Sequence, residues 1–126
     1  MKNLNPFILL TTILAIFSAC GNSIDETKII GNWTATAFIE NNTPKEVDLN
    51  AINFSFYDNN TYTFQGLMNK EAGNYHIRRN LLYSTDTLSD NRIEKSVKII
   101  TLKSDSLFFE MNNGGITQII KLHKTN

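Results

Sequence analysis

The side chains that could act as nucleophiles or metal ligands are few and far apart in the sequence. The chain has one cysteine, Cys20, and two histidines, His76 and His123. A metal site normally needs three or four convergent ligands, and the sequence contains no HExxH, CxxC or glycine-rich phosphate motif. We therefore expect no metal site and no cofactor, and we interpret both histidines as solvated surface residues.

The acidic residues give no clearer sign of catalysis. Asp86, Asp90 and Asp105 lie where turns are expected, and aspartate is common in turns because it bonds the backbone there. The 12 basic residues balance the 12 acidic residues, so the net charge is zero. A nucleic-acid binder would normally show a basic surface. We predict no catalytic residue, no nucleic-acid partner and no enzymatic activity.

The surroundings of Cys20 indicate export rather than chemistry. One cysteine cannot form a disulfide within the chain. The chain begins with a single basic residue, Lys2, continues without charge through residues 7–17, and reaches two small residues, Ser18 and Ala19. This is the order of parts in a secretory signal peptide. The apolar segment, 16 residues from Leu4 to Ala19, is too short for a typical transmembrane helix.

Residues 17–20, Phe-Ser-Ala-Cys, resemble a bacterial lipobox, with Phe17 at a position that leucine usually occupies. The resemblance implies that the Cys20 thiol carries diacylglycerol, that the chain is cut before it, and that the new N-terminus is acylated. Several acyl chains hold a protein on a membrane more firmly than one, at ~0.8 kcal/mol per buried CH₂ group. The alternatives are a conventional cleaved signal and a buried free thiol.

The lipobox divides the chain into three predicted parts. Residues 1–19 are a signal peptide, residues 20–27 are a short polar tether, and residues 28–126 form the domain. Through its acyl anchor the protein would be attached to the outer membrane, facing either the periplasm or the cell surface. Lipidation would also leave Cys20 unavailable as a nucleophile.

The domain is predicted to be all-β. From residue 28 onward, apolar and polar residues alternate in short segments that are separated by turn residues. The predicted strands are 29–39, 52–57, 61–67, 72–77, 81–85, 93–103, 106–111 and 116–124. The apolar phase changes within residues 93–103, which indicates a bulge or a strand covered on both faces. Residues 40–50 form a polar connection with room for a helical turn.

Short turns between consecutive strands favour an antiparallel meander. Eight such strands can close into a small up-and-down β-barrel, which removes the exposed sheet edges. A β-sandwich would explain the alternation of apolar residues equally well. The tight hairpins favour the barrel, because Greek-key sandwiches need longer crossings.

Gly31-Asn32-Trp33 resembles the Gly-x-Trp signature of the lipocalins and their calycin relatives. The segments 54–62, 73–77 and 100–107 also resemble lipocalin-like domains found in lipoproteins of Bacteroidota. The resemblance covers about residues 28–124 and implies a lipocalin-like barrel.

The resemblance also assigns roles to the signature residues. Gly31 would let the chain bend, and Trp33 would plug one end of the barrel, with its N–H reaching a carbonyl. In lipocalins a basic residue of the last strand packs over this tryptophan, and Lys121, His123 and Lys124 are the candidates here. The alternative interpretation, in which Trp33 is an ordinary core residue, makes nearly the same prediction.

Two functions remain open from the sequence. The first is a binding module for a small hydrophobic ligand, with the connection 40–50 as a lid and Tyr62, Phe64, Tyr75 and Phe109 lining the cup. The second is a filled barrel that binds an envelope protein through loops such as 86–91 or 112–115, as an inhibitor or an accessory subunit. An eight-stranded barrel is near the size at which side chains either fill the interior or leave space for one small ligand.

Overall fold

The computed structural model describes residues 24–126, so Cys20 and the predicted signal peptide lie outside the described residues. The strands of the domain are β1 (Gly31–Glu40), β2 (Thr43–Pro44), β3 (Asn53–Phe56), β4 (Thr61–Gln65), β5 (Lys70–Arg78), β6 (Leu81–Asp86), β7 (Glu94–Leu102), β8 (Ser106–Asn113) and β9 (Ile116–Lys124). Two short 3₁₀ helices complete the described fold, η1 (Glu26–Ile29) and η2 (Leu49–Ala51). The predicted all-β fold is confirmed.

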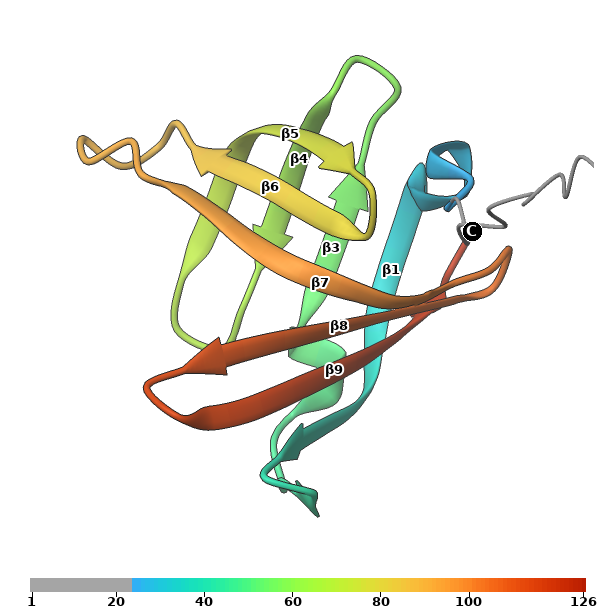
Figure 1. Ribbon diagram of the computed structural model, residues 1–126, viewed down its shortest axis with the longest axis vertical. Coiled ribbons are helices and arrows are strands. Elements are labelled where there is room, and N and C mark those ends of the chain that lie inside the picture. The colour runs from blue at the N-terminus through green and yellow to red at the C-terminus, as the bar shows by residue number, and fades with distance from the viewer. Residues whose placement is uncertain (1–23) are drawn as a thin grey trace, which may run out of the picture.

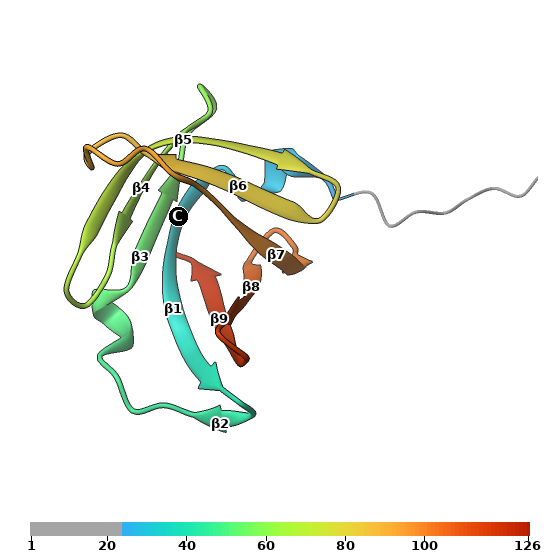
Figure 2. The same ribbon diagram turned by 60° about the vertical axis from the view of Figure 1, so that its left-hand side comes forward.

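The strands close into a barrel (Figures 1 and 2). Each strand from β3 to β9 pairs antiparallel with the next, and β1 pairs with β3 on one side and β9 on the other. The two-residue β2 is an extension that, among the described residues, pairs with the end of β1 alone. The predicted eight-stranded up-and-down barrel is therefore confirmed, and the sandwich alternative is wrong.

The phase change predicted in residues 93–103 is a β-bulge. Ile99 pairs with Phe109 and Thr101 pairs with Phe108, so Ile100 is an extra residue between them. Its side chain is 44% exposed, whereas Ile99 is buried. Because the extra residue turns outward, the alternation of inward and outward residues shifts by one at the bulge, and apolar residues occupy a different phase on each side of it.

A second bulge, in β1, was not predicted from the sequence. Ala35 pairs with Leu122 and Ala37 with Lys121, which leaves Thr36 as the extra residue. Beyond this bulge Phe38 packs against the core. In the sequence, the apolar alternation of the predicted strand 29–39 runs through Trp33, Ala35, Ala37 and Ile39. An inward phase that continues through Ala37 and Ile39 is therefore wrong, because a bulge shifts the alternation by one residue.

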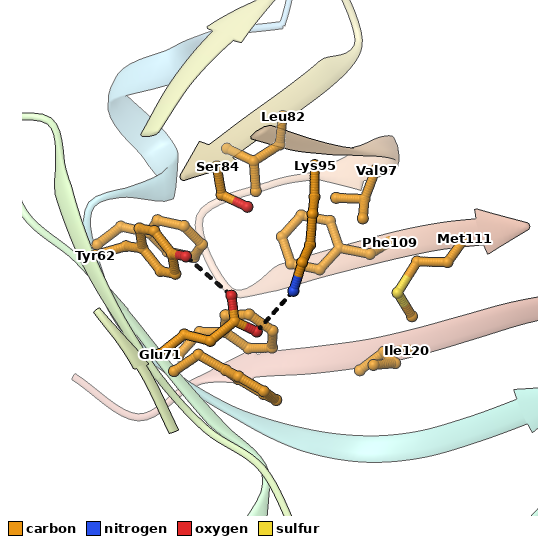
Figure 3. Close-up of a pocket in the computed structure, with 12 residues that line it drawn as sticks. Tyr62, Glu71, Leu82, Ser84, Lys95, Val97, Phe109, Met111 and Ile120 are labelled. Atoms are coloured by element: carbon orange, nitrogen blue, oxygen red, sulfur yellow. Dashed lines mark hydrogen bonds and ion pairs between the residues drawn. The ribbon is translucent and has the colours of Figure 1, made fainter. Parts of the chain in front are cut away.

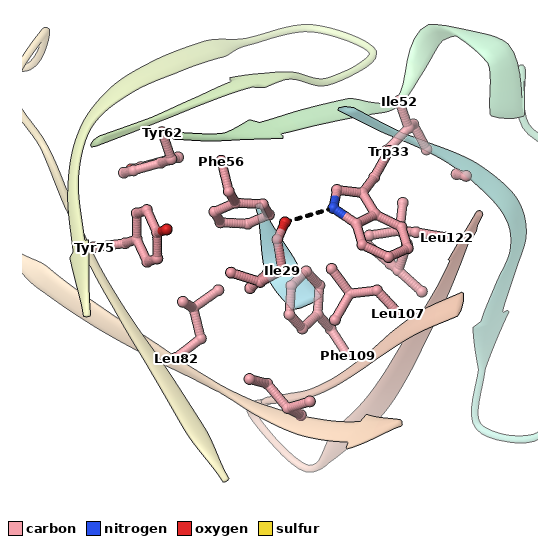
Figure 4. Close-up of a cluster of buried hydrophobic side chains, with 13 residues drawn as sticks. Ile29, Trp33, Ile52, Phe56, Tyr62, Tyr75, Leu82, Leu107, Phe109 and Leu122 are labelled. Atoms are coloured by element: carbon pink, nitrogen blue, oxygen red, sulfur yellow. Dashed lines mark hydrogen bonds between the residues drawn. The ribbon is translucent and has the colours of Figure 1, made fainter. Parts of the chain in front are cut away.

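The end of the barrel near η1, which we call the closed end, is filled by Trp33 (Figure 4). The Trp33 side chain is fully buried, and its Nε1–H donates a hydrogen bond of 2.8 Å to the carbonyl oxygen of Ile29. Lys124 lies over the indole ring, with its Nζ 5.3 Å from the ring centroid. Of the three basic candidates on the last strand, Lys124 therefore occupies the position over the tryptophan.

The folded domain begins earlier than predicted. Asp25 caps η1 by accepting a hydrogen bond of 3.1 Å from the backbone N–H of Thr27. Ile24 is partly buried and packs against the core, and Ile29 is fully buried. The predicted tether of residues 20–27 thus overlaps the domain at its last residues.

Residues 24–126 contain a complete core. The buried apolar side chains come from η1, from the residue between η2 and β3, and from every barrel strand: Ile29, Trp33, Ala35, Ile52, Phe56, Tyr62, Tyr75, Leu82, Ile99, Leu107, Phe109, Ile120 and Leu122. The sheet closes within the same residues. Because both the core and the sheet are complete, we expect this segment to fold as an independent unit.

The hydrogen bond of Trp33 gives the first testable prediction. The Trp33→Phe variant should lose about 2–4 kcal/mol of unfolding free energy, because the smaller ring leaves a void and leaves the Ile29 carbonyl without its donor. Denaturant unfolding of residues 24–126, followed by circular dichroism, measures this loss. The control Tyr57→Phe changes a side chain that is 45% exposed and should stay within about 0.5 kcal/mol of the parent. Equal stability of the two variants would refute the role of Trp33.

Candidate functional site

A cavity of about 200 Å³ lies inside the barrel (Figure 3). Its lining residues come from seven strands: Phe54, Phe56, Tyr62, Phe64, Glu71, Leu82, Ser84, Lys95, Val97, Phe109, Met111 and Ile120. For comparison, an engineered apolar cavity of about 150 Å³ in another protein binds benzene. The space therefore suits a small organic molecule or part of a longer apolar chain.

The strand order explains the position of the cavity. In an up-and-down barrel, alternate turns lie at the same end. The β4–β5 and β6–β7 connections therefore share the end opposite η1, which we call the open end. Phe64 and Glu71 flank the first connection, and Lys95 follows the second. Trp33 lies near the start of β1, at the closed end.

An aromatic cluster forms one wall of the cavity. The Phe54 ring lies 4.6 Å from the Phe64 ring and 5.6 Å from the Phe109 ring, measured between centroids. Phe56 and Phe109 line the cavity and also belong to the buried core, each only 2% exposed, so they form its floor toward the closed end. Mutually packed rings hold their positions at low entropic cost, and the wall is therefore largely preformed.

Three of the four side chains predicted to line a cup do line this cavity, namely Tyr62, Phe64 and Phe109. Tyr75 does not. Its ring packs edge-to-face on Phe56 at 5.1 Å, and its hydroxyl donates a hydrogen bond of 3.0 Å to the Tyr57 carbonyl. Tyr75 faces inward but lies nearer the closed end, in the core.

The connection 40–50, which was predicted to be a lid, does not contact the cavity. No residue of the connection 40–50 is among the residues that line the described cavity. Val47 and Leu49 instead pack against the core. The apolar side chains within this polar connection explain the difference, because burying them fixes the loop against the barrel wall.

A polar cluster, which sequence reasoning did not find, lies inside the cavity. The Tyr62 hydroxyl donates a hydrogen bond of 3.1 Å to Oε1 of Glu71, and Lys95 Nζ lies 3.5 Å from Oε2 of the same carboxylate. The Glu71 side chain is 15% exposed and the Lys95 side chain 60%. The Ser84 side chain also lines the cavity beside them (Figure 3).

The inward phase of each strand contained the signal for this cluster. On β5, Tyr75 and Gly73 are in the inward phase, and the next position in that phase toward the start of the strand is Glu71. On β7 the phase of Val97 reaches Lys95 in the same way. The predicted strand 72–77 begins one residue after Glu71, so the prediction does not include this inward carboxylate.

The environment of Tyr62 keeps its phenol protonated. Burial raises the pKa of Tyr62 well above its ordinary value, and the negative charge of Glu71 raises it further. The phenol therefore remains a hydrogen-bond donor to Glu71 throughout the physiological pH range. This holds the carboxylate in a fixed orientation inside the cavity.

The other candidate residues lie on the surface. His76 and His123 are both exposed, and His76 stacks on Tyr83 with the ring centroids 4.8 Å apart. Within residues 24–126, no three potential metal-ligating side chains converge. In the same part of the chain, none of the helices has the length and apolar character needed to cross a membrane.

Comparison with known proteins gives consistent results. The family model described as "Lipocalin-like domain" matches residues 29–109. A crystal structure of a lipocalin-like protein from Bacteroides uniformis superposes with a TM-score of 0.58 at 16% identity, over 77% of this chain and 98% of the other. An uncharacterized protein from Bacteroides eggerthii superposes with a TM-score of 0.54 at 13% identity, over 76% and 98% of the two chains. A search of curated proteins gave no match.

The raised pKa of Tyr62 predicts a loss of stability in alkali. A free tyrosine ionises at about pH 10, so the unfolded chain releases this proton before the folded protein does. The stability that the phenol contributes is complete below about pH 10 and declines as the pH rises further. Between about pH 9 and about pH 11, the Tyr62→Phe variant should lose less unfolding free energy than the parent. Parallel pH profiles in denaturant titrations would contradict this assignment.

Proposed function

Because the chain belongs to the lipocalin-like domain family, we propose that its barrel is a non-enzymatic binding module for one small, largely apolar ligand. The observation that carries this proposal is the cavity of about 200 Å³, whose lining is mainly aromatic and aliphatic. Sites for small molecules are commonly such preformed apolar pockets with a few polar groups that orient the ligand.

The distribution of bulky side chains favours this function over a filled barrel. Trp33, Phe56 and Tyr75 fill the closed half of the interior, where they are buried. In the open half, the rings of Phe54 and Phe64 stand against each other on the wall and leave the space beside them open. A barrel that served only as a rigid support for surface loops would gain stability by filling this space.

The proposal includes attachment to the outer membrane through an acylated Cys20. The described chain begins beside η1, at the closed end of the barrel. An anchor that precedes residue 24 would therefore tether the closed end, and the cavity would open away from the site of attachment. Such an orientation leaves the mouth accessible to ligands from the surrounding aqueous space.

Occupying the cavity with a larger side chain should abolish ligand binding. Val97 and Ile100 both lie on β7, but Val97 lines the cavity whereas Ile100 is the outward bulge residue. We expect residues 24–126 to retain a small apolar compound from a lipid extract in native mass spectrometry. The Val97→Phe variant should lose this adduct, and the matched control Ile100→Phe should keep it.

Two results would contradict the binding function. One is a spectrum of the parent domain that stays free of ligand with every extract tested. The other is an adduct that persists unchanged in a folded Val97→Phe variant, which would place the compound outside the cavity. Specific recovery of an envelope protein by an otherwise ligand-free barrel would favour the alternative, an inhibitor or accessory subunit.

Lipid attachment has its own test. The Cys20→Ser variant of the full chain should lose labelling by a palmitate analogue and leave the membrane fraction, because serine has no thiol to carry diacylglycerol. The Phe17→Leu variant introduces the residue usual in a lipobox and should remain labelled. Undiminished labelling of Cys20→Ser would overturn the assignment of the anchor.

A further inference from the structure

The polar groups of the cavity are gathered on one side. Tyr62, Glu71, Ser84 and Lys95 come from the four consecutive strands β4, β5, β6 and β7. The lining residues from the remaining strands are all apolar: Phe54, Phe56, Phe109, Met111 and Ile120. A ligand in this space would meet hydrogen-bonding groups on one side only. The arrangement therefore fits a molecule with one polar end and an apolar body.

Glu71 is the central acceptor of this polar side. Its two carboxylate oxygens offer about four lone-pair positions. Within residues 24–126, the carboxylate has one hydrogen bond from Tyr62 and one ion pair with Lys95. The carboxylate can thus accept further hydrogen bonds from a molecule in the cavity, while Tyr62 holds it in place.

Lys95 is a weak competitor for the same carboxylate. Its side chain is 60% exposed, and the Nζ–Oε2 distance is 3.5 Å. An ion pair with a largely solvated lysine contributes little free energy, because water screens it and the long side chain must be ordered. Lys95 reaches Glu71 from β7, two strands away from β5 (Figure 3). The ammonium group can therefore swing into solvent and yield its place to a ligand.

We infer that the ligand is a small amphiphile whose polar end donates hydrogen bonds, a hydroxyl or a protonated amine, and that Glu71 receives this end. The inference rests on the proposed binding function and specifies its ligand class. The apolar body of the ligand lies against Phe54, Phe109 and Met111.

The same geometry disfavours anionic ligands. A carboxylate at the polar end would lie beside the fixed charge of Glu71, which Lys95 neutralises only from a solvated position. Like charges in a partly desolvated site repel strongly, and this repulsion discriminates against one head group while the apolar contacts stay constant. Glu71 therefore acts as a specificity-determining residue.

A matched series of ligands tests the inference. Octan-1-ol, octylammonium and octanoate share one apolar chain and differ in the head group. Calorimetric titration of residues 24–126 near neutral pH should show tighter binding of the alcohol and the ammonium than of octanoate. In Glu71→Gln, which preserves the side-chain shape, the ratio of octylammonium to octanoate affinity should fall at least about tenfold, the size expected for a hydrogen bond to a charged group.

Two further variants serve as controls. Glu94→Gln removes an equal charge from the exposed residue that precedes Lys95, and should keep the affinity ratio of the parent. Lys95→Gln removes the competitor for Glu71 and should keep or strengthen the binding of octylammonium. Loss of octylammonium binding in a folded Lys95→Gln variant would overturn the inference.

The outcomes separate this inference from the proposed function. If none of the three probes binds the folded parent domain, the proposed binding function itself fails. If octanoate binds tightest, or if Glu71→Gln leaves the affinity ratio unchanged, apolar ligand binding stands and the role of Glu71 is refuted. Tighter binding of both donor ligands, abolished selectively by Glu71→Gln, supports the inference.

Discussion

The pairing of β1 with β9 is the constraint on which the rest of the structure depends. It joins the first and last barrel strands along seven residue pairs, from Trp33–Lys124 to Glu40–Gln118. Closure removes both edges of the sheet and fixes the number of strands in the ring at eight. The strand number in turn limits the width of the interior, so a few large side chains decide whether the barrel is solid or hollow.

The interior is divided unequally between the two ends. At the closed end, η1 lies against the barrel and brings the Ile29 carbonyl to the indole of Trp33. The same strand pairing places Lys124 opposite Trp33, which is why the lysine can lie over the ring. At the open end no comparable plug is present among the described residues, and the aromatic rings pack against the wall instead of across the centre. The buried Trp33 with its hydrogen bond thus lies at the closed end, and the cavity lies at the open end.

The fold could be predicted well from the sequence because its determinants are local. Each of the eight predicted strands corresponds to an observed strand, with its ends within two residues. The bulge in β7 left a visible phase change, since apolar residues continue on both sides of Ile100. The bulge in β1 left no visible phase change. Ala37, Phe38 and Ile39 are all apolar, so the sequence does not show the one-residue shift of the alternation.

The candidate site was only partly predictable, for a different reason. Aromatic residues in an alternating strand indicate an interior position. Their position along the barrel axis, however, depends on strand register and on closure of the sheet. Tyr62 and Tyr75 both point inward and both belong to the core, and it is the register that leaves Tyr62 beside the cavity and Tyr75 away from it. Charged residues that point inward are harder to predict, because charged positions in an alternating pattern are normally assigned to the exposed face.

The polar cluster is better explained by function than by folding. The fully buried core of the described chain contains no charged side chain, so the fold does not require one. Replacing a partly buried ion pair by apolar residues of similar volume is often neutral or stabilising in proteins. Yet the chain places Glu71 and Lys95 at inward positions of two different strands, where apolar residues would complete the wall. Charges that the buried core does not require and that converge in the cavity support the proposed role of this site in selecting a ligand.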